Sequence, residues 1–147
     1  MIRLTKIFTF ETAHALYGYK GKCKNIHGHS YKLYVTVKGK PISNIHHPQN
    51  GMVLDFGDLK EIVHNLIIEP FDHAILLNTH TQHKLLGEEL HKQGHKVILT
   101  DYQPTCENMI QYFAEIISKA LDSSIVLEEL KLHETENSYC EWKRIDQ

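Results

Sequence analysis

The sequence predicts an α+β fold in which a four-stranded antiparallel sheet carries two helices on one face. Two strand-like runs lie before residue 40, two amphipathic helical patterns follow between residues 55 and 121, and two more strand-like runs come after residue 125. Strands that flank a group of helices, in the order ββααββ, are typical of an antiparallel sheet with its helices on one side. At 147 residues the chain is expected to form one domain, 1–147, with a hydrophobic core large enough to be stable without covalent cross-links.

The first two expected strands cover residues 7–14 and 29–38. In the second run, apolar side chains alternate with polar ones at a period of two, which indicates a half-buried strand. The apolar positions are Tyr31, Leu33, Val35 and Val37. The connection from 15 to 26 contains Gly18 and Gly21, so we expect an antiparallel hairpin.

Two helices are expected next, each with a capping residue. Asp55 is placed to cap the first, in which apolar residues recur at helical spacing until Pro70 ends it. Thr105 is placed to cap the second, and Glu107 complements the positive end of that helix. The apolar stripe of the first helix is Leu59, Ile62, Val63, Leu66 and Ile67.

The segment at about 79–103 is predicted to be an insertion into this plan. It is polar and rich in histidine, with a weak helical pattern, a stop at Gly94 and a short strand at 97–99. We interpret its histidines as solvated surface residues, because Gly94 separates His91 from His95.

The third expected strand ends on an unusual carboxylate. Val126, Leu130, Leu132 and Glu134 share one side of this strand, so Glu134 terminates an apolar face. A buried carboxylate needs a partner. Glu134 either reaches water at the strand end or accepts two parallel N–H donors, such as a guanidinium or the N–H edge of a pterin or guanine.

Three histidines are the strongest candidates for a metal site. His27 and His29 lie two apart at the start of a strand and therefore point the same way, and His14 at the end of the preceding strand is the best third ligand. Three neutral imidazoles suit Zn²⁺ and leave a fourth position open, which is the catalytic pattern of zinc sites. The alternative is a polar strand entry beside a satisfied, partly buried His14.

Composition narrows the classes of function. The formal net charge of −2 gives no indication of a nucleic-acid or membrane surface. Three scattered cysteines make neither a disulfide framework nor a Cys-x-x-Cys pair, and the N-terminus lacks the features of a signal peptide. We therefore expect a cytoplasmic protein without nucleic-acid or membrane partners.

The motifs in their order resemble a known family, the 6-pyruvoyltetrahydropterin synthases and the bacterial 6-carboxy-5,6,7,8-tetrahydropterin synthases of queuosine biosynthesis. Each motif alone is weak evidence for this family, but six motifs in the family's order are specific to it. They are Phe10-Glu11-x-Ala13-His14, Cys23-x-x-x-His27-Gly28-His29, Asp55-Phe56-x-x-Leu59-Lys60, Asp72-His73, Pro104-Thr105-x-Glu107-Asn108 and Glu134-Thr135.

The resemblance implies a role for each candidate residue. His14, His27 and His29 would be zinc ligands. Cys23 would be the catalytic thiol, Asp72 and His73 an acid–base dyad, and Glu134 the anchor of the pterin ring, with Thr105 and Glu107 lining the pterin pocket. The implied fold is the tunnelling fold (T-fold), assembled as a homohexamer with active sites between subunits. Judged by its residues alone, Asp72-His73 is a common dipeptide that is more often solvated than catalytic.

The resemblance also implies a reaction on a small pterin. Three residues separate Cys23 from His27, which is similar to the bacterial carboxy branch. That branch converts 7,8-dihydroneopterin triphosphate and water into 6-carboxytetrahydropterin, acetaldehyde and triphosphate. Because the 79–103 segment is longer than usual, the alternatives are a 6-pyruvoyltetrahydropterin synthase or a lyase that cleaves the pterin side chain for folate.

Two alternatives come from other classes of protein. In a noncatalytic, zinc-stabilised binding module, Cys23 would be a fourth zinc ligand and would close the site. In a zinc hydrolase, a metal-bound hydroxide would attack another small molecule, and neither Cys23 nor Glu134 would be needed.

Overall fold

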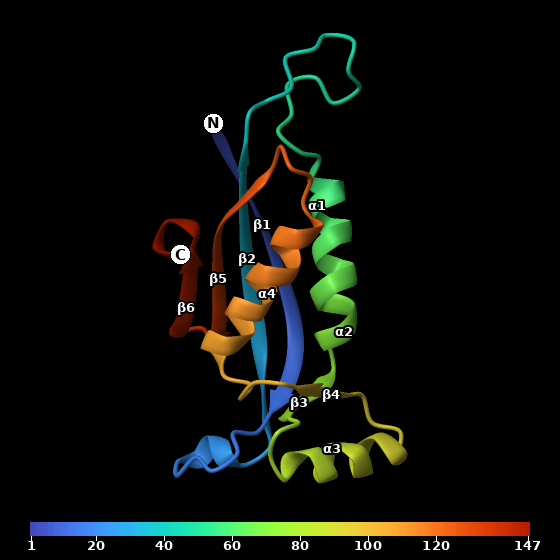
Figure 1. Cartoon of the computed structure of the whole chain (residues 1–147), viewed down its shortest axis with the longest axis vertical. Helices are drawn as coiled ribbons and strands as arrows, with labels where there is room; N and C mark the ends of the chain where they lie inside the picture. Colours follow the sequence, from blue (N-terminus) through green and yellow to red (C-terminus); the bar gives the residue numbers. More distant parts are fainter.

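A long antiparallel hairpin organises the structure, a computed structural model that describes all 147 residues. Strands β1 (Ile2–His14) and β2 (His27–Gly39) pair along their whole length, from Ile2 opposite Gly39 to His14 opposite His27. The hairpin loop contains a short 3-10 turn, η1 (Lys22–Lys24), and lies at one end of the molecule (Figure 1). The predicted hairpin is confirmed, and its closed end brings His14 and His27 together.

The sheet has six strands, in the order β4-β3-β1-β2-β5-β6. The four predicted antiparallel strands are present, with β5 (Val126–Thr135) beside β2 and β6 (Ser138–Lys143) at the edge. Beyond β1, the sheet continues with β3 (Ala74–Asn78) and β4 (Val97–Thr100), both parallel to their neighbours. The expected four-stranded sheet therefore has two further strands, of which β3 was not predicted and β4 was predicted as a short strand of the inserted segment.

Strand β3 escaped prediction because it is buried on both faces. Ala74 and Leu76 belong to the main core, whereas Ile75 and Leu77 belong to a second, smaller cluster. Parallel strands covered on both sides have continuous apolar runs, without the alternation that identifies a half-buried strand. The short strand predicted at 97–99 is confirmed as β4.

Both predicted helices cover one face of the sheet (Figure 1). The first comprises α1 (Phe56–Val63), a π-helical segment η2 (His64–Ile68) and α2 (Glu69–Phe71), and the second is α4 (Cys106–Ala120). The predicted caps are confirmed, because Asp55 accepts a hydrogen bond from the Gly57 amide and Thr105 accepts one from the Asn108 amide. These helices and the sheet enclose a core cluster of 23 buried residues.

Pro70 does not end the first helix where we expected. The helix runs on to Phe71, and the five residues of η2 before Glu69 adopt the wider π turn. This widening relieves the clash between the proline ring and the carbonyl four residues earlier, and the proline also lacks an N–H to donate.

The inserted segment forms a third helix, α3 (His83–Lys92), followed by β4. Gly94 follows this helix with a φ of 91°, so the predicted stop is confirmed. Leu90 of α3 packs against the cluster of Ala15, Ile75 and Leu77. Because Ile75 and Leu77 point away from the main core, α3 covers the opposite face of the sheet from α1 and α4, and the helices are not confined to one face.

A β-bulge changes the side-chain pattern of β5. Thr36 pairs with Glu129 and Val37 pairs with Leu127, so Glu128 is an extra residue without an opposite partner. Upstream of the bulge the buried residue is therefore Leu127, at 1% exposure, rather than Val126 as the alternation predicted. Downstream the alternation resumes as predicted and directs Glu134 toward the end of the hairpin.

The remaining element is a C-terminal 3-10 turn, η3 (Arg144–Asp146). None of the helices combines the length and the apolarity that a membrane crossing would need.

Candidate active site

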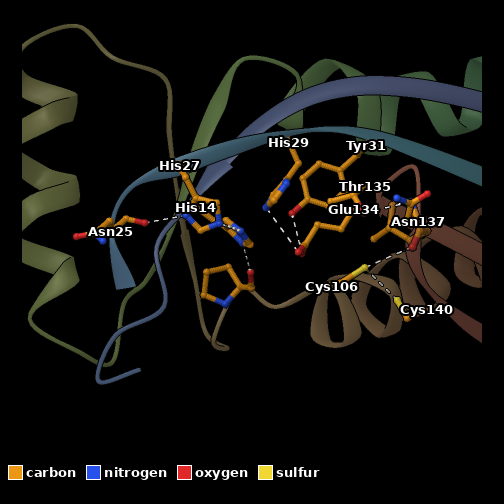
Figure 2. A network of polar contacts seen from close by, with 12 residues as sticks. His14, Asn25, His27, His29, Tyr31, Cys106, Glu134, Thr135, Asn137 and Cys140 are labelled. Atoms are coloured by element: carbon orange, nitrogen blue, oxygen red, sulfur yellow. Dashed lines mark hydrogen bonds and ion pairs between the residues drawn. The ribbon is translucent and has the colours of Figure 1, made fainter. Parts of the chain in front are cut away.

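The three candidate histidines meet at the closed end of the β1–β2 hairpin (Figure 2). His14 is the last residue of β1 and lies opposite His27, the first residue of β2, while His29 lies opposite Thr12. Each histidine offers one ligand atom, and these three atoms lie within 4.8 Å of one another. The three imidazoles therefore converge on one point, as predicted.

Backbone carbonyls determine which nitrogens face the centre of the cluster. Nδ1 of His14 lies 2.6 Å from the Pro104 carbonyl oxygen, and Nδ1 of His27 lies 2.8 Å from that of Asn25. A carbonyl can only accept, so each Nδ1 carries a proton and donates it. In the neutral rings both Nε2 atoms therefore present lone pairs, and these two atoms are 3.0 Å apart.

This arrangement fits a cation. Two lone pairs at 3.0 Å repel each other unless a proton or a metal ion lies between them or beside both. Nε2 of His29 is buried without a hydrogen-bond partner, and the nearest carboxylate oxygen, Oε1 of Glu134, is 3.5 Å away. An orphaned nitrogen and two opposed lone pairs are the donor set that a metal ion would satisfy.

Burial keeps the imidazoles in the form that binds metal. Desolvation lowers the pKa of His14 and of His29 below the 6.5 of a solvated imidazole, because burial disfavours the charged ring. Both rings are then neutral at pH 7, as a metal ligand must be. Three nitrogen ligands fit tetrahedral Zn²⁺ with one position left open.

A cavity of about 310 Å³ opens beside the histidine cluster. Five of the predicted site residues line it, contributed by four separate parts of the chain. They are His14 from β1, Cys23 from the hairpin loop, Thr105 and Glu107 from the start of α4, and Glu134 from β5. Leu16, Tyr19, Cys106, Ser138, Tyr139 and Cys140 complete the lining.

The carboxylate of Glu134 faces both His29 and the buried Tyr31 (Figure 2). Its Oε1 faces His29, and its Oε2 lies 3.5 Å from the hydroxyl of Tyr31, which can donate only weakly at this distance. Burial raises the pKa of Tyr31 far above its usual value, so the phenol keeps its proton. The Tyr31 ring is 1% exposed and stacks on Phe10 with a centroid distance of 5.3 Å.

Asp72 and His73 form a pair, but on the other side of the sheet. Nδ1 of His73 lies 3.0 Å from Oδ2 of Asp72. The Glu11 amide donates to Oδ1 of Asp72, and this hydrogen bond lowers the pKa of the carboxyl group. The two side chains turn together as the dyad hypothesis requires.

The dyad nevertheless lies apart from the cavity within one chain. His73 is 76% exposed and borders a shallow depression whose lining also includes Thr12 and His29. Glu11, Gly28 and Ser30 of the same lining alternate with Thr12 and His29 along β1 and β2, so their side chains lie on the outer face of the sheet. His73 has a φ of 60°, a strained value for a non-glycine residue, and its amide is bound to the Glu11 carbonyl.

Several residues of the site were missed by the sequence-based hypothesis. Tyr31 could have been found, because it follows His29 by two positions and shares its face. Nothing in the sequence around Cys140 indicated that it lies in the site. The carbonyls of Asn25 and Pro104 that orient the imidazoles could not be found, since any residue supplies a carbonyl and only the fold directs it.

Comparison with known proteins identifies relatives along nearly the whole chain. The family model described as 6-pyruvoyl tetrahydropterin synthase matches residues 3–144. A 6-carboxy-5,6,7,8-tetrahydropterin synthase of Haemophilus influenzae is 33% identical over 144 residues, covering 97% of this chain and 99% of the relative. A 6-pyruvoyl tetrahydrobiopterin synthase of Poecilia reticulata is 30% identical over 147 residues, covering 92% and 85%.

Solved structures agree with this assignment. The 6-pyruvoyl tetrahydropterin synthase of Caenorhabditis elegans superimposes with a TM-score of 0.68 at 25% sequence identity. The superposition covers 97% of this chain and 94% of the other. The predicted T-fold is therefore confirmed.

Proposed function

The chain belongs to the 6-pyruvoyl tetrahydropterin synthase family, and from this premise we propose that it is a zinc-dependent 6-carboxy-5,6,7,8-tetrahydropterin synthase. The proposed reaction converts 7,8-dihydroneopterin triphosphate and water into 6-carboxytetrahydropterin, acetaldehyde and triphosphate, for queuosine biosynthesis in the cytoplasm. The relative from Haemophilus influenzae that carries this name supports the choice of product. So does the spacing of three residues between Cys23 and His27.

One observation carries the proposal. His14, Cys23 and Glu134 come from distant parts of the sequence, yet they line the same cavity of about 310 Å³. A metal ligand, a thiol base and a carboxylate in one cavity would together provide a Lewis acid, a proton acceptor and a substrate anchor. A purely structural zinc site would need neither the thiol base nor the carboxylate.

His14, His27 and His29 would hold the zinc ion. When bound, the ion would polarise the oxygen of a substrate side-chain hydroxyl and so acidify the adjacent C–H bonds. The Nδ1 hydrogen bonds of His14 and His27 to backbone carbonyls would fix the orientation of both rings and make them better ligands.

The other residues of the cavity would hold the pterin and move protons. Glu134 would accept the two parallel N–H donors of the pterin ring, a charge-assisted pair that fixes the ring in the plane of the carboxylate. Thr105 and Glu107 would form the wall beside the ring. Cys23, as a thiolate, would remove a carbon-bound proton from the side chain.

Asp72 and His73 would act on the cavity of a neighbouring subunit. Their placement on the outer face, with His73 76% exposed, supports this arrangement. Asp72 would hold the imidazole in one tautomer while His73 delivers or removes the second proton. We therefore propose a homohexamer with active sites between subunits.

Product analysis tests the proposal. The zinc-loaded protein is incubated with 7,8-dihydroneopterin triphosphate, and the products are identified by mass spectrometry beside a Cys23→Ala variant of measured zinc content. We expect 6-carboxytetrahydropterin and acetaldehyde from the wild type. Cys23→Ala is expected to lower turnover about 10²- to 10⁴-fold with unchanged zinc. Unchanged substrate from a metal-replete wild-type sample would refute the proposal.

A second product within the family has support from the inserted segment. Residues 79–103 border the dyad, since Lys96 Nζ donates to the Asp72 carbonyl. In addition, the relative from Poecilia reticulata is named for the pyruvoyl product. The same experiment separates these candidates. 6-Pyruvoyltetrahydropterin would indicate the pyruvoyl synthase, and a hydroxymethylpterin would indicate a side-chain-cleaving lyase for folate.

Candidates of other classes are separated by substitution. In a noncatalytic module with a Cys-His₃ site, Cys23→Ala would release zinc. Against this candidate, the group of potential ligand atoms comprises the three histidines without Cys23. In a zinc hydrolase, Glu134→Ala would leave turnover nearly intact. In the proposed synthase it would weaken substrate binding by about 1.5–3 kcal/mol, which is roughly 10- to 160-fold.

A further inference from the structure

The cavity contains a second pair of reactive groups that the proposed mechanism does not use. Cys106, the first residue of α4, and Cys140, in β6, have their Sγ atoms 3.1 Å apart and are both free thiols. Both line the same cavity as Cys23, so all three cysteines of the chain meet there. The pair lies on the side of Glu134 away from the histidines (Figure 2).

Backbone structure holds the two thiols together. Cys140 lies directly opposite Leu132 in the β5–β6 ladder. The Sγ atom of Cys106 lies 3.4 Å from the carbonyl oxygen of the same Leu132. A helix start and an edge strand are therefore both fixed at one point of β5, and their sulfur atoms need to approach by only about 1 Å to reach the 2.05 Å of a disulfide bond.

The two thiols differ in accessibility. Cys106 is buried, at 9% exposure, and its Sγ lies within hydrogen-bond distance of the Leu132 carbonyl, whereas Cys140 is only partly buried. A disulfide reagent that enters the cavity therefore meets Cys140 first, so we assign Cys140 as the attacking thiol and Cys106 as the resolving one.

We propose that Cys106 and Cys140 are a redox-active dithiol, which low-molecular-weight disulfides such as oxidised glutathione convert reversibly into an intramolecular disulfide. The Cys140 thiolate attacks one sulfur of the reagent, forming a mixed disulfide and releasing one glutathione thiolate. Cys106 then loses its proton to solvent and attacks the Cys140 sulfur, which releases the second glutathione. Two protein thiols are oxidised, and one glutathione disulfide is reduced to two thiols.

The disulfide changes the wall of the cavity. It replaces the hydrogen bond from Cys106 to the Leu132 carbonyl with a covalent link between the start of α4 and β6. The residues beside the two cysteines, Thr105, Glu107 and Tyr139, all line the cavity. Oxidation therefore fixes one side of the cavity in place, and reduction frees it.

Thiol chemistry tests the inference without any pterin turnover. The reduced protein is treated with oxidised glutathione, alkylated and mapped by mass spectrometry. We expect a peptide that links Cys106 to Cys140, a protein lighter by two hydrogen atoms, one remaining alkylatable thiol at Cys23, and full reversal by dithiothreitol. The oxidised form is expected to have the higher Tm, because the link constrains the unfolded chain.

Matched variants identify the roles within the pair. In Cys106→Ala, Cys140 is expected to remain as a mixed disulfide with glutathione, and the rise in Tm disappears. In Cys23→Ala, the linked peptide forms as in the wild type. Absence of the Cys106–Cys140 peptide, or a link from either cysteine to Cys23, would overturn the inference. Neither result depends on the proposed function, so the two proposals fail separately.

Discussion

At the scale of single residues, the opposed imidazoles of His14 and His27 define the site. Their Nε2 atoms are 3.0 Å apart, and because two backbone carbonyls hold the ring protons on the Nδ1 atoms, two lone pairs face each other across this distance. Such a contact costs energy in the metal-free protein, and a bound metal ion would relieve it. The same residues therefore connect the stability of the fold with occupancy of the site.

This connection predicts a pH dependence of stability in the metal-free protein. Burial lowers the pKa of His14 and His29 in the folded state, so between the folded and unfolded pKa values the unfolded chain binds more protons. Their contribution to stability is full above about pH 6.5 and is lost as the pH falls. We expect the free energy of unfolding to fall by at most about 1.4 kcal/mol per pH unit for each ring.

Urea denaturation in the presence of a chelator, between about pH 7.5 and 5.5, measures this slope. His14→Gln is the matched control, because its amide does not titrate while the other histidines remain. A wild-type slope no steeper than that of His14→Gln would contradict the assignment.

How much of the site the sequence predicts also depends on individual residues. His27, His29 and Glu134 were placed correctly because each lies on a strand, where a period of two fixes the side of the sheet. The outer-face position of Asp72 and His73 was not predicted, because His73 adopts a φ of 60° after a helix end and no periodicity governs such a turn.

At the scale of elements, the inserted segment supports the loop that carries Cys23. The side-chain amide of Gln103 donates to the Tyr17 carbonyl at 2.9 Å, and the ring of His83 in α3 meets the Tyr17 ring edge-on with a centroid distance of 5.1 Å. Within the loop, the Leu16 amide donates to the Cys23 carbonyl at 2.9 Å. The insertion thus contacts the loop a few residues from the candidate thiol.

We predict that Gln103→Ala loosens this loop. Loss of one side-chain hydrogen bond to the backbone costs about 1 kcal/mol, so local opening should increase about fivefold. The rate of Cys23 alkylation by iodoacetamide, followed at that peptide, is expected to rise accordingly. Gln111→Ala, an exposed substitution on α4, serves as the matched control. Equal alkylation rates in Gln103→Ala and the wild type would show that the contact does not restrain the loop.

The elements that periodicity predicts are those with one buried face, namely the β1–β2 hairpin and both capped helices. Strand β4, whose Ile98 and Val97 pack against different clusters, was predicted instead from a short apolar run after Gly94. Strand β3 was missed because both of its faces are buried, and Val126 was misplaced because the bulge at Glu128 interrupts the alternation. Neither feature leaves a periodic trace in the sequence.

At the scale of the whole molecule, the separation of the dyad from the cavity is the main consequence of the fold. Cys23 lines a cavity on the inner side of the sheet, whereas Asp72 and His73 lie on its outer face. Within one chain the thiol and the dyad therefore lie on different faces of the sheet, and the proposed assembly of several chains would bring them to one substrate.

Mixing two inactive variants tests the shared site. Cys23→Ala and His73→Ala are co-expressed with different tags, and assemblies that contain both are purified. If each site takes Cys23 from one subunit and His73 from another, random mixing of equal amounts restores about a quarter of the sites. If each chain supplies both residues of its own site, every site keeps one defect and no activity returns.

We expect His14, His27 and His29 to form an open metal site beside a free catalytic thiol. X-ray absorption at the zinc edge, on protein loaded with one equivalent of zinc, tests this arrangement. We predict nitrogen ligands from three imidazoles, at about 2.0–2.1 Å, and no sulfur ligand. A sulfur ligand at about 2.3 Å would make Cys23 a part of the metal site and would contradict the catalytic account.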